Sequence, residues 1–366
     1  MKIQDITSLL ETIAPLSFQE DYDNAGLITG DADWECTGVI VSLDVIENVV
    51  EEAIEKNCNL IVAHHPIIFR GLKKITGKNY VEKTIITAIK NDIAIYAIHT
   101  NLDNIKPGVN KKMAERLDLQ NIQILQPKHG LLKKLVVFAP IDYAEKVKNA
   151  LFDAGAGNIG KYSDCSFISE GKGTFKPGKE ADPFVGEIGI RHLETETKIE
   201  VIFPSYLEQK IIASMIEAHP YEEVAYEIYS LDNSLQDVGS GMIGDLPFAV
   251  AEVQFLKDVQ KHFGLQVIRH TTLLNNEVSR IALCGGAGIF LLSAALSAKA
   301  DAFITSDIKY HEFFDAEGKI LLADIGHYES EQYTIDLLFD ILRQNFPNFA
   351  VLKTGINTNP VHYFKG

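Results

Sequence analysis

The chain has 366 residues, of which 46% are hydrophobic, and this is enough to fill more than one core. Lysine and arginine number 34 against 50 aspartate and glutamate residues, which gives a formal net charge of −16. Such a charge repels phosphate backbones and anionic membranes, so nucleic acid and membrane surfaces are poor candidates as partners.

The four cysteines are scattered and form no CxxC pair. This spacing argues against a disulfide framework and a thiolate zinc site, so we expect a protein of the reducing cytoplasm. The first residues lack a basic start followed by an unbroken apolar run. The longest apolar stretch, which starts at Ile289, is shorter than the roughly 20 residues that cross a bilayer. We expect neither a signal peptide nor a membrane span.

Residues 1–16 predict an amphipathic helix, and short apolar runs with polar or glycine ends then alternate with helical patterns. The predicted strands end at Asp44, at His64 and His65, at His99 with Asp103 beyond it, at Gly285, at Asp307, and just before His327. This alternation predicts the α/β class, with a largely parallel sheet and helices on both faces. Ligands gather beyond the carboxyl ends of such strands, so we expect the polar tails to converge on one crevice.

The middle of the chain has another pattern. KLVVFAP from Lys134 and KIEVIFP from Lys198 are each followed by a helical pattern and then by more strand. Strand, proline and helix, repeated in this way, predict an α+β ferredoxin-like domain. We place this inserted domain at residues 130–235 and a discontinuous metal-binding α/β domain at 1–129 and 236–366.

The adjacent histidines His64 and His65 stand where a buried strand is predicted to end, and Pro66 keeps His65 out of a helix. Successive side chains of a strand face opposite ways, so both rings reach one ion only if the backbone bends. Two neighbouring ions resolve this difficulty, because each ring can bind a different one. The alternative is that one or both rings are bonded to backbone in the core or at the surface.

The segment 326–342 predicts a single helix that starts after Asp324 or Gly326. His327 and Glu331 then lie one turn apart and face the same ion. The alternative is a solvated acidic face, but the position directly after a buried strand favours a site.

Asp103 follows His99 in the segment AIHTNLD, and a carboxylate there could bridge two cations about 3.5–4 Å apart. The alternative is that Asp103 caps a turn. Three histidines and two carboxylates suit zinc, manganese, iron or cobalt better than calcium. We expect two divalent ions per chain, with zinc as the first choice.

Asp44, Asp307 and His99 are expected beside the ligands, where they would orient ligands or substrate or move protons. Asp307 and His311 also stand four residues apart, as they would on one face of a helix.

Two further segments have open interpretations. The loop CGGAG at 284–288 either presents backbone N–H groups to an anion or allows close packing of strand and helix. The cluster His219-Pro220-Tyr221-Glu222-Glu223 is expected to build an interface or an effector contact, and His219 as a metal ligand is the weaker alternative.

The segments AHHPIIF, HTNLD and GHYESE, with YDNAGL at Tyr22–Leu27, resemble the Nif-three-like family, whose members are often labelled GTP cyclohydrolase type 2 homologues. The resemblance covers nearly the whole chain, and the insert is similar to the small trimeric PII or CutA-type domain of the longer bacterial members. Tyr22, where many relatives carry tryptophan, is a conservative departure. The resemblance implies a dinuclear metal centre and a ring-like homo-oligomer, commonly a hexamer. The implied ligands are His64, His65, Asp103, His327 and Glu331, with His99 as an extra contact.

Two functions agree with these residues. The first is a metal-dependent hydrolase of a small molecule, namely a nucleotide, phosphoester or cyclic amide, because two cations activate water and neutralise developing charge. The second is a non-enzymatic metal-binding regulatory or scaffold protein whose inserted domain binds an effector or a partner. A cysteine nucleophile finds little support, since Cys165 and Cys284 lack a triad context.

Overall fold

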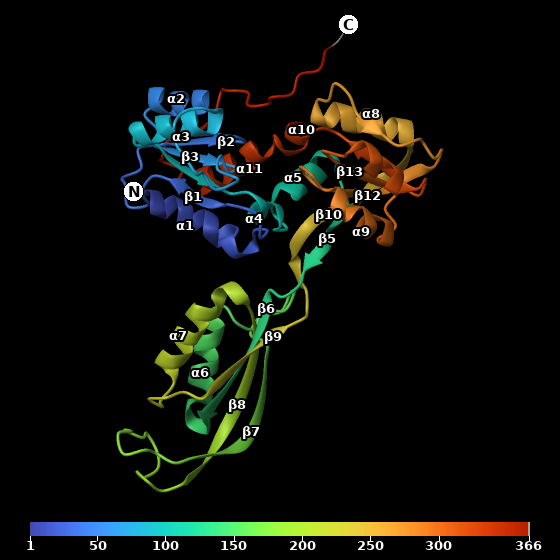
Figure 1. Cartoon of the computed structure of the whole chain (residues 1–366). Helices are drawn as coiled ribbons and strands as arrows, with labels where there is room; N and C mark the ends of the chain where they lie inside the picture. The colour runs from blue at the N-terminus through green and yellow to red at the C-terminus, as the bar shows by residue number, and fades with distance from the viewer. Residues whose placement is uncertain (365–366) are drawn as a thin grey trace. The chain divides into compact units, whose positions relative to one another are not determined.

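The structure is a computed structural model that describes residues 1–364. The described residues form a mixed α/β fold with three sheets, in two compact units (Figure 1). Residues 1–126 and the segment from Asp237 onward form the main unit, and residues 127–236 form the inserted unit. Among the described residues, no helix has the length and apolar character that a membrane crossing needs.

The first sheet of the main unit has five strands. Its order is β1 (Gly26–Thr29), β4 (Ala94–Ala97), β3 (Leu60–Ala63), β2 (Val39–Ser42) and β15 (Val351–Lys353). Strands β15, β2, β3 and β4 are parallel to one another, and β1 is antiparallel to β4. Every residue of β2, β3 and β4 is buried, as their nearly continuous apolar sequences require of parallel strands covered on both faces.

Helices cover both faces of this sheet (Figure 1). They are α1 (Ile3–Ile13), α2 (Glu47–Glu55), α3 (Tyr80–Lys90) and α11 (Thr334–Asn345). Ile40, Ile61 and Ile95 of the strands pack with the buried faces of α2 and α3 in one core. A one-turn 3₁₀ helix (Leu16–Phe18) and the helices α4 (Thr100–Asp103) and α5 (Val109–Arg116) complete this half of the main unit.

The second sheet of the main unit has six strands. Its order is β11 (Arg269–His270), β14 (Leu321–Asp324), β13 (Ala302–Thr305), β12 (Glu277–Leu283), β10 (Leu235–Ala251) and β5 (Gln120–Lys128). The three central strands β12, β13 and β14 are parallel, whereas β10 and β11 are antiparallel to their partners β12 and β14.

Two cores flank the second sheet. One contains Phe255, Val259 and Phe263 of α8 (Glu252–Phe263), and the other contains Leu292 and Ala295 of α9 (Leu292–Ser297). The remaining short helices are η3 (Ile289–Leu291), η4 (Tyr310–Ala316) and α10 (His327–Glu331). The single sheet predicted from the sequence is therefore two sheets: β15, β2, β3 and β4 form one parallel group, and β12, β13 and β14 form another that is bounded on both sides by the antiparallel strands β10 and β11.

The helix predicted over 326–342 is also divided. Helix α10 ends at Glu331 and α11 begins at Thr334, with Gln332 and Tyr333 between them. Tyr333 packs against Phe263, their ring centroids 6.0 Å apart, and Arg116 lies over its ring. Tertiary packing at this point overrides the continuous helical pattern of the sequence.

The inserted unit has one antiparallel sheet with two helices. The strand order is β7 (Ser166–Phe175), β8 (His192–Pro204), β6 (Leu132–Pro140) and β9 (Tyr226–Leu231). Helices α6 (Ile141–Asp153) and α7 (Glu208–Ala218) lie on one face, and a 3₁₀ turn (Ser205–Leu207) precedes α7. Leu135, Val201 and Phe203 from the strands and Leu151 and Met215 from the helices form its own core.

Candidate metal centre

The first three predicted ligands come from neighbouring parallel strands. His64 and His65 directly follow β3, and Asp103 is the last residue of the short helix α4 that follows β4. Because β3 and β4 are parallel, their carboxyl ends meet at the same edge of the sheet. The polar side chains that follow these two buried strands therefore lie close together.

Helix α10 brings the other two predicted ligands from the second sheet. It begins at His327 and ends at Glu331, so the two side chains lie one turn apart. Gly326 caps this helix with a φ of +89°, and a side chain there would collide with the carboxylate of Glu329. Glycine is therefore needed for the sharp turn from β14 into α10.

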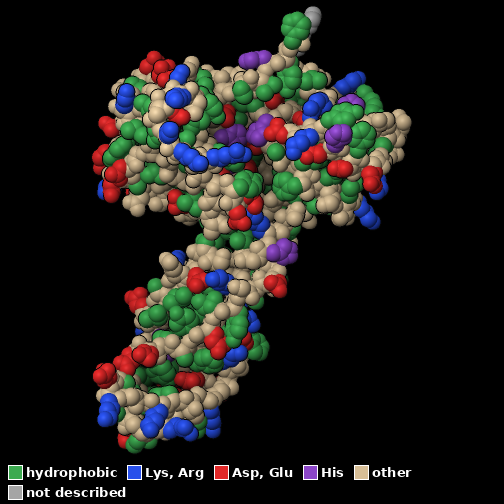
Figure 2. All heavy atoms as spheres, in the orientation of Figure 1, with side chains coloured by type: hydrophobic (Ala, Val, Ile, Leu, Met, Phe, Trp, Pro, Cys, Tyr) green, Lys and Arg blue, Asp and Glu red, His purple; other side chains and the backbone are tan. Residues whose placement is uncertain are grey.

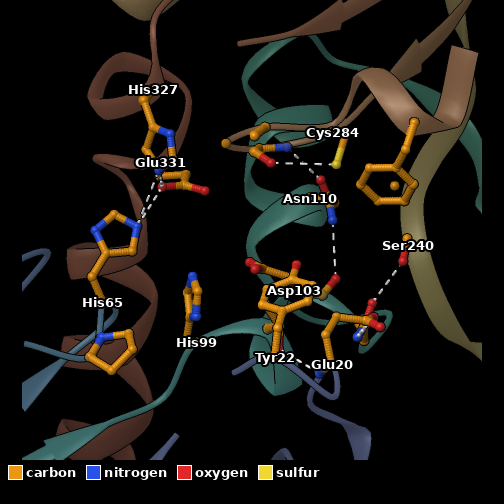
Figure 3. A pocket seen from close by; sticks show the side chains of 18 of the residues that line it. Glu20, Tyr22, His65, His99, Asp103, Asn110, Ser240, Cys284, His327 and Glu331 are labelled. Atoms are coloured by element: carbon orange, nitrogen blue, oxygen red, sulfur yellow. Dashed lines mark hydrogen bonds and ion pairs between the residues drawn. The ribbon is translucent and has the colours of Figure 1, made fainter. Parts of the chain in front are cut away.

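Two groups of donor atoms share the carboxylate of Glu331. Figure 3 shows the first group, His65, His327 and Glu331. In the first, Oε2 of Glu331 lies 2.9 Å from Nε2 of His65 and 3.1 Å from Nε2 of His327. In the second, Nε2 of His64 lies 3.6 Å from Oδ1 of Asp103 and 3.9 Å from Oε1 of Glu331. Within each group the donor atoms lie within 4.8 Å of one another. Glu331 belongs to both groups, and Asp103 belongs to the second.

Each of these three histidines is oriented through its Nδ1 atom. The Nδ1 distances are 2.8 Å from His65 to Asp44, 2.7 Å from His327 to Asp307 and 2.9 Å from His64 to the carbonyl oxygen of Ile98. Fixing Nδ1 in this way turns Nε2 toward the centre, as is common for metal-ligating histidines. Asp44 and Asp307 therefore lie behind the rings, on the side away from Nε2.

Carboxylates determine the charge of two of the rings. Burial alone would lower the pKa of His65, but hydrogen bonds with Asp44 and Glu331 outweigh it and raise that pKa to about 10. Burial likewise opposes the charge of His327, yet Glu331 and Asp307 raise its pKa to about 11. Without an added cation, both rings hold a proton to balance the carboxylates.

The second group, His64, Asp103 and Glu331, is called the deeper group here because His64 is fully buried. Its carboxylate charge is not balanced by a protonated ring of its own. Burial lowers the pKa of His64 to about 3, so this ring is neutral. Burial, and then the charge of Glu331, raise the pKa of Asp103 well above its usual range. Although burial opposes it, His327 and His65 hold the pKa of Glu331 well below its usual range. Two close carboxylates beside a neutral imidazole form an environment that favours a bound cation.

Two buried atoms of the deeper group have no hydrogen-bond partner among the described residues, namely Nε2 of His64 and Oδ1 of Asp103. An unsatisfied buried polar group costs about 1–3 kcal/mol. A cation bound by both atoms would remove this cost. Imidazole nitrogens together with carboxylate oxygens suit zinc, manganese, iron or cobalt. The residues therefore fit a divalent metal centre.

His99 also reaches the centre, where it forms a third group of donor atoms with His64 and His65. Its Nδ1 lies 2.7 Å from Oδ1 of Asp23, whose other oxygen accepts hydrogen bonds from the backbone and hydroxyl of Thr100. Burial would raise the pKa of Asp23, but the hydrogen bond with His99 outweighs it and lowers that pKa to about 2. The sequence contained Asp23 in a family motif but gave no signal for this contact across 76 positions.

Thr358 is a further residue that the sequence did not single out. Its hydroxyl donates to Oδ2 of Asp44 at 2.7 Å, and Asp44 in turn holds the ring of His65. The contact joins positions 314 residues apart, so no local pattern could have revealed it.

Asp307 and His311 do not lie on one helix face, although they are four residues apart. Asp307 has a φ of +56°, which no helical residue adopts, and η4 begins only at Tyr310. His311 is exposed and stacks on Phe314, with ring centroids 6.4 Å apart. Asp307 therefore contacts the ring of His327, and His311 takes no part in this contact.

The loop at 284–288 packs closely and does not present its glycine amides to an anion. Its amide donors are used internally, from Gly285 to Asn110, from Gly286 to Ser330 and from Gly288 to Thr305. Gly286 has a φ of +62°, and a side chain there would collide with the carboxylate of Glu331. Of the two interpretations, close packing is the one that the contacts support.

His219 is engaged within the inserted unit. Its Nε2 lies 2.9 Å from the carbonyl oxygen of Phe138, and its Nδ1 accepts a hydrogen bond from the backbone of Tyr221 at 3.1 Å. Both ring nitrogens are therefore occupied, and none is left for a metal ion.

The centre opens into a cavity of about 360 Å³ (Figure 3). The ligand candidates that line it are His65, Asp103, His327 and Glu331. Three large rings also line it and remain exposed, at 63% for Tyr22, 47% for Phe69 and 61% for Phe290. A pocket of this size, with polar groups converging on one side and apolar rings around it, is typical of small-molecule sites.

Comparison with known proteins places the chain in a family. Residues 1–360 match the family described as Duf34/NIF3 (NGG1p interacting factor 3), and the chain belongs to it. It is 40% identical over 327 residues to a Bacillus subtilis (strain 168) protein named "GTP cyclohydrolase 1 type 2 homolog", which covers 89% of this chain and 88% of that protein. A Halalkalibacterium halodurans protein of the same name is 39% identical over 363 residues, with 98% and 97% covered.

The fold is also similar to a solved structure. The structure titled "The Crystal Structure of Bacillus cereus protein related to NIF3" has a TM-score of 0.86 and 38% identity, covering 100% of this chain and 99% of that one. The resemblance stated from the sequence motifs is therefore confirmed.

Proposed function

We propose that the protein is a metal-dependent hydrolase with two divalent cations per chain, zinc being the first choice. The observation that carries this proposal is the pair of donor groups that share Glu331, together with the unpartnered buried atoms of His64 and Asp103. Two such cations would activate a water molecule and neutralise negative charge that develops on a substrate.

The residues of the chain would bind the two cations and keep the ligand side chains in place. His65 and His327 would contribute to one cation, and His64 and Asp103 to the other, with Glu331 between them. Asp44 and Asp307 would keep the imidazole rings in place, and His99 would add a further contact at the cavity.

We further propose that the substrate is a phosphoester. The loop that follows Phe69 carries four basic side chains: Arg70, Lys73, Lys74 and Lys78. All four are exposed, and none makes an ion pair with another described residue, although the chain carries a net charge of −16. Figure 2 shows lysine and arginine side chains next to the histidines on this face. The loop adjoins the cavity through Phe69, which lines it, and unpaired positive charge near a cavity attracts anionic ligands.

The test begins with metal content and turnover of the purified protein. Metal per chain is measured by elemental analysis, and turnover is screened on phosphomonoesters, phosphodiesters, nucleotides including GTP, and cyclic amides. GTP is included because of the name of the relatives. Asp103→Ala is expected to lose metal and activity together. Asp315→Ala, which changes an exposed aspartate of η4, is the matched control and should keep both.

Two results would contradict the proposal. Activity that survives complete metal removal would exclude the metals from the reaction. Full metal loading with no turnover on any class would favour the second function, a metal-binding regulatory or scaffold protein. A separate core and a separate cavity in the inserted unit are the observations that favour this second function.

The same proposal includes the assembly and the nature of the insert. We propose a cytoplasmic homohexamer, and a ferredoxin-like inserted domain of the PII or CutA type. The order strand, helix, strand, strand, helix, strand from β6 to β9 supports the second point. Light scattering coupled to size-exclusion chromatography measures the number of chains, and a monomer would contradict the assembly.

A further inference from the structure

The inserted unit has a cavity of its own, of about 470 Å³, which the metal chemistry does not use. It lies between the sheet and the irregular segment that follows β7, from Lys176 to Val185. Its volume is within the range of small-molecule pockets. Two features of its wall point to one class of ligand.

The first feature is a set of aromatic rings. Those that line the cavity are Phe138, Phe175, Phe184 and Tyr221. The centroid of the Tyr221 ring lies 6.0 Å from that of Phe175 and 6.1 Å from that of Phe184. The ring of His219 packs edge-on against that of Tyr221, with the ring centroids 5.0 Å apart. The backbone N–H of Tyr221 also donates a hydrogen bond to Nδ1 of His219. None of the four lining rings is fully buried, so aromatic faces remain open to a ligand.

The second feature is an excess of negative charge. Three glutamates line the cavity, Glu196, Glu222 and Glu223, against one basic residue, Lys176. Glu222 accepts a hydrogen bond from the backbone of Asp182 at 2.9 Å and so ties the irregular segment to the wall.

Of the three glutamates, Glu196 is the one best placed to bind a ligand. It makes no ion pair with any described residue, although the cavity is partly enclosed. Its carboxylate lies where a side chain at Gly173 of β7 would be, so the glycine leaves room for it. The hydroxyl of Tyr221 is buried beside this carboxylate: burial, and then the charge of Glu196, raise the pKa of the tyrosine.

We infer that this cavity binds a small organic cation, such as a primary or quaternary ammonium compound. Open aromatic faces attract a cation through the negative charge of the ring face, and an unpaired carboxylate adds a full opposite charge. An anion would be repelled by the three glutamates. A metal ion fits poorly, because the described residues of the inserted unit contain no group of three metal donors.

The experiment titrates the full-length, metal-loaded protein with choline, and with putrescine as a primary diamine, by isothermal calorimetry. The neutral compound 3,3-dimethyl-1-butanol has nearly the shape of choline and tests the charge. We expect saturable binding of at least one cation, and binding of the neutral compound weaker by about tenfold or more.

Variants then place the ligand in the cavity. Glu196→Gln keeps the size of the side chain and should weaken binding about tenfold, and Phe184→Leu should weaken it by a similar factor. Glu187→Gln changes an exposed glutamate that does not line the cavity and should have no effect. A thermal melt of each variant confirms that it is folded.

Three results would overturn the inference. The first is no cation binding up to 10 millimolar, a concentration that exceeds the expected dissociation constants by about tenfold. The second is equal binding of choline and its neutral analogue, which would mean an apolar pocket only. The third is unchanged binding in Glu196→Gln, which would place the cation elsewhere. None of these results depends on turnover at the metal centre.

Discussion

The main unit and the inserted unit both surround a cavity with carboxylates and flat rings, but they treat the carboxylates differently. In the main unit, Glu331, Asp44 and Asp307 each lie 2.7–3.1 Å from a histidine nitrogen. In the inserted unit, Glu196 makes no ion pair with a described residue and shares its cavity with phenyl rings.

This difference corresponds to the two kinds of cation recognition that we propose. Carboxylates braced by imidazoles place donor atoms at fixed positions, which suits a small ion with a defined coordination geometry. A carboxylate among aromatic faces offers diffuse attraction, which suits a larger organic cation. The experiments below test the separation of the two regions, from the largest expected effect to the smallest.

Glu331→Gln is expected to have the largest effect. This carboxylate belongs to both donor groups, so its loss should strongly reduce the metal that the protein retains after dialysis, while the inserted unit keeps its thermal stability. Elemental analysis measures the metal per chain. Glu329→Gln, on the same helix and outside both groups, should retain normal metal content. Retention of metal in Glu331→Gln would mean that the two groups do not share this ligand.

Phe203→Ala changes the core of the inserted unit and tests whether metal binding in the main unit is affected. Phe203 is fully buried in a core made only of residues of that unit. Its truncation should destabilise the unit by about 3–5 kcal/mol and leave metal content unchanged. Chemical denaturation followed by circular dichroism measures the change. Phe167→Ala, at a position 67% exposed, should cost less than about 0.5 kcal/mol. Loss of metal in Phe203→Ala would show that the two regions are coupled.

Asp44→Asn tests the support behind one ligand. The asparagine can still contact His65, but it no longer carries the charge that stabilises the ring in its orientation. Metal affinity should fall about 10- to 100-fold, as measured by competition with a chelator. Asp21→Asn, at an exposed aspartate, should bind metal as the parent does. An unchanged affinity in Asp44→Asn would remove the orienting role.

The smallest effect is expected from the titration of His219. Burial lowers the pKa of this histidine below its usual value of 6.5, so the unfolded chain takes up the proton first as the pH falls. The unfolding free energy of the inserted unit should therefore decrease below about pH 6.5 and be insensitive to this group above it. Denaturation of His219→Gln should show a flatter pH dependence, whereas the exposed His129→Gln should follow the parent. A parent curve that rises on acidification would contradict the sign.

The sequence predicted much of what depends on local pattern. The buried strands before Asp44, before His64 and before His99 are present, and their polar tails do meet. They meet because parallel strands present their carboxyl ends together, which is a consequence of chain direction alone. Helix α10 likewise carries His327 and Glu331 on one face.

Long-range features could not be predicted in this way. The division into two sheets depends on which strands pair, including the pairing of β15 from the end of the chain with β2, and the break after Glu331 depends on packing around Tyr333. The contacts of Asp23 with His99 and of Thr358 with Asp44 join distant segments. A periodicity in one segment carries no information about such partners.

The close approach of Gly286 to Glu331 has a consequence for mutational scanning. Position 286 contributes no donor atom, yet any side chain there would displace the carboxylate that the two donor groups share. In a saturation library selected for function, this glycine should tolerate replacement as poorly as a ligand does. A map of intolerant positions would therefore overcount the metal-binding residues unless backbone space is considered beside side-chain chemistry.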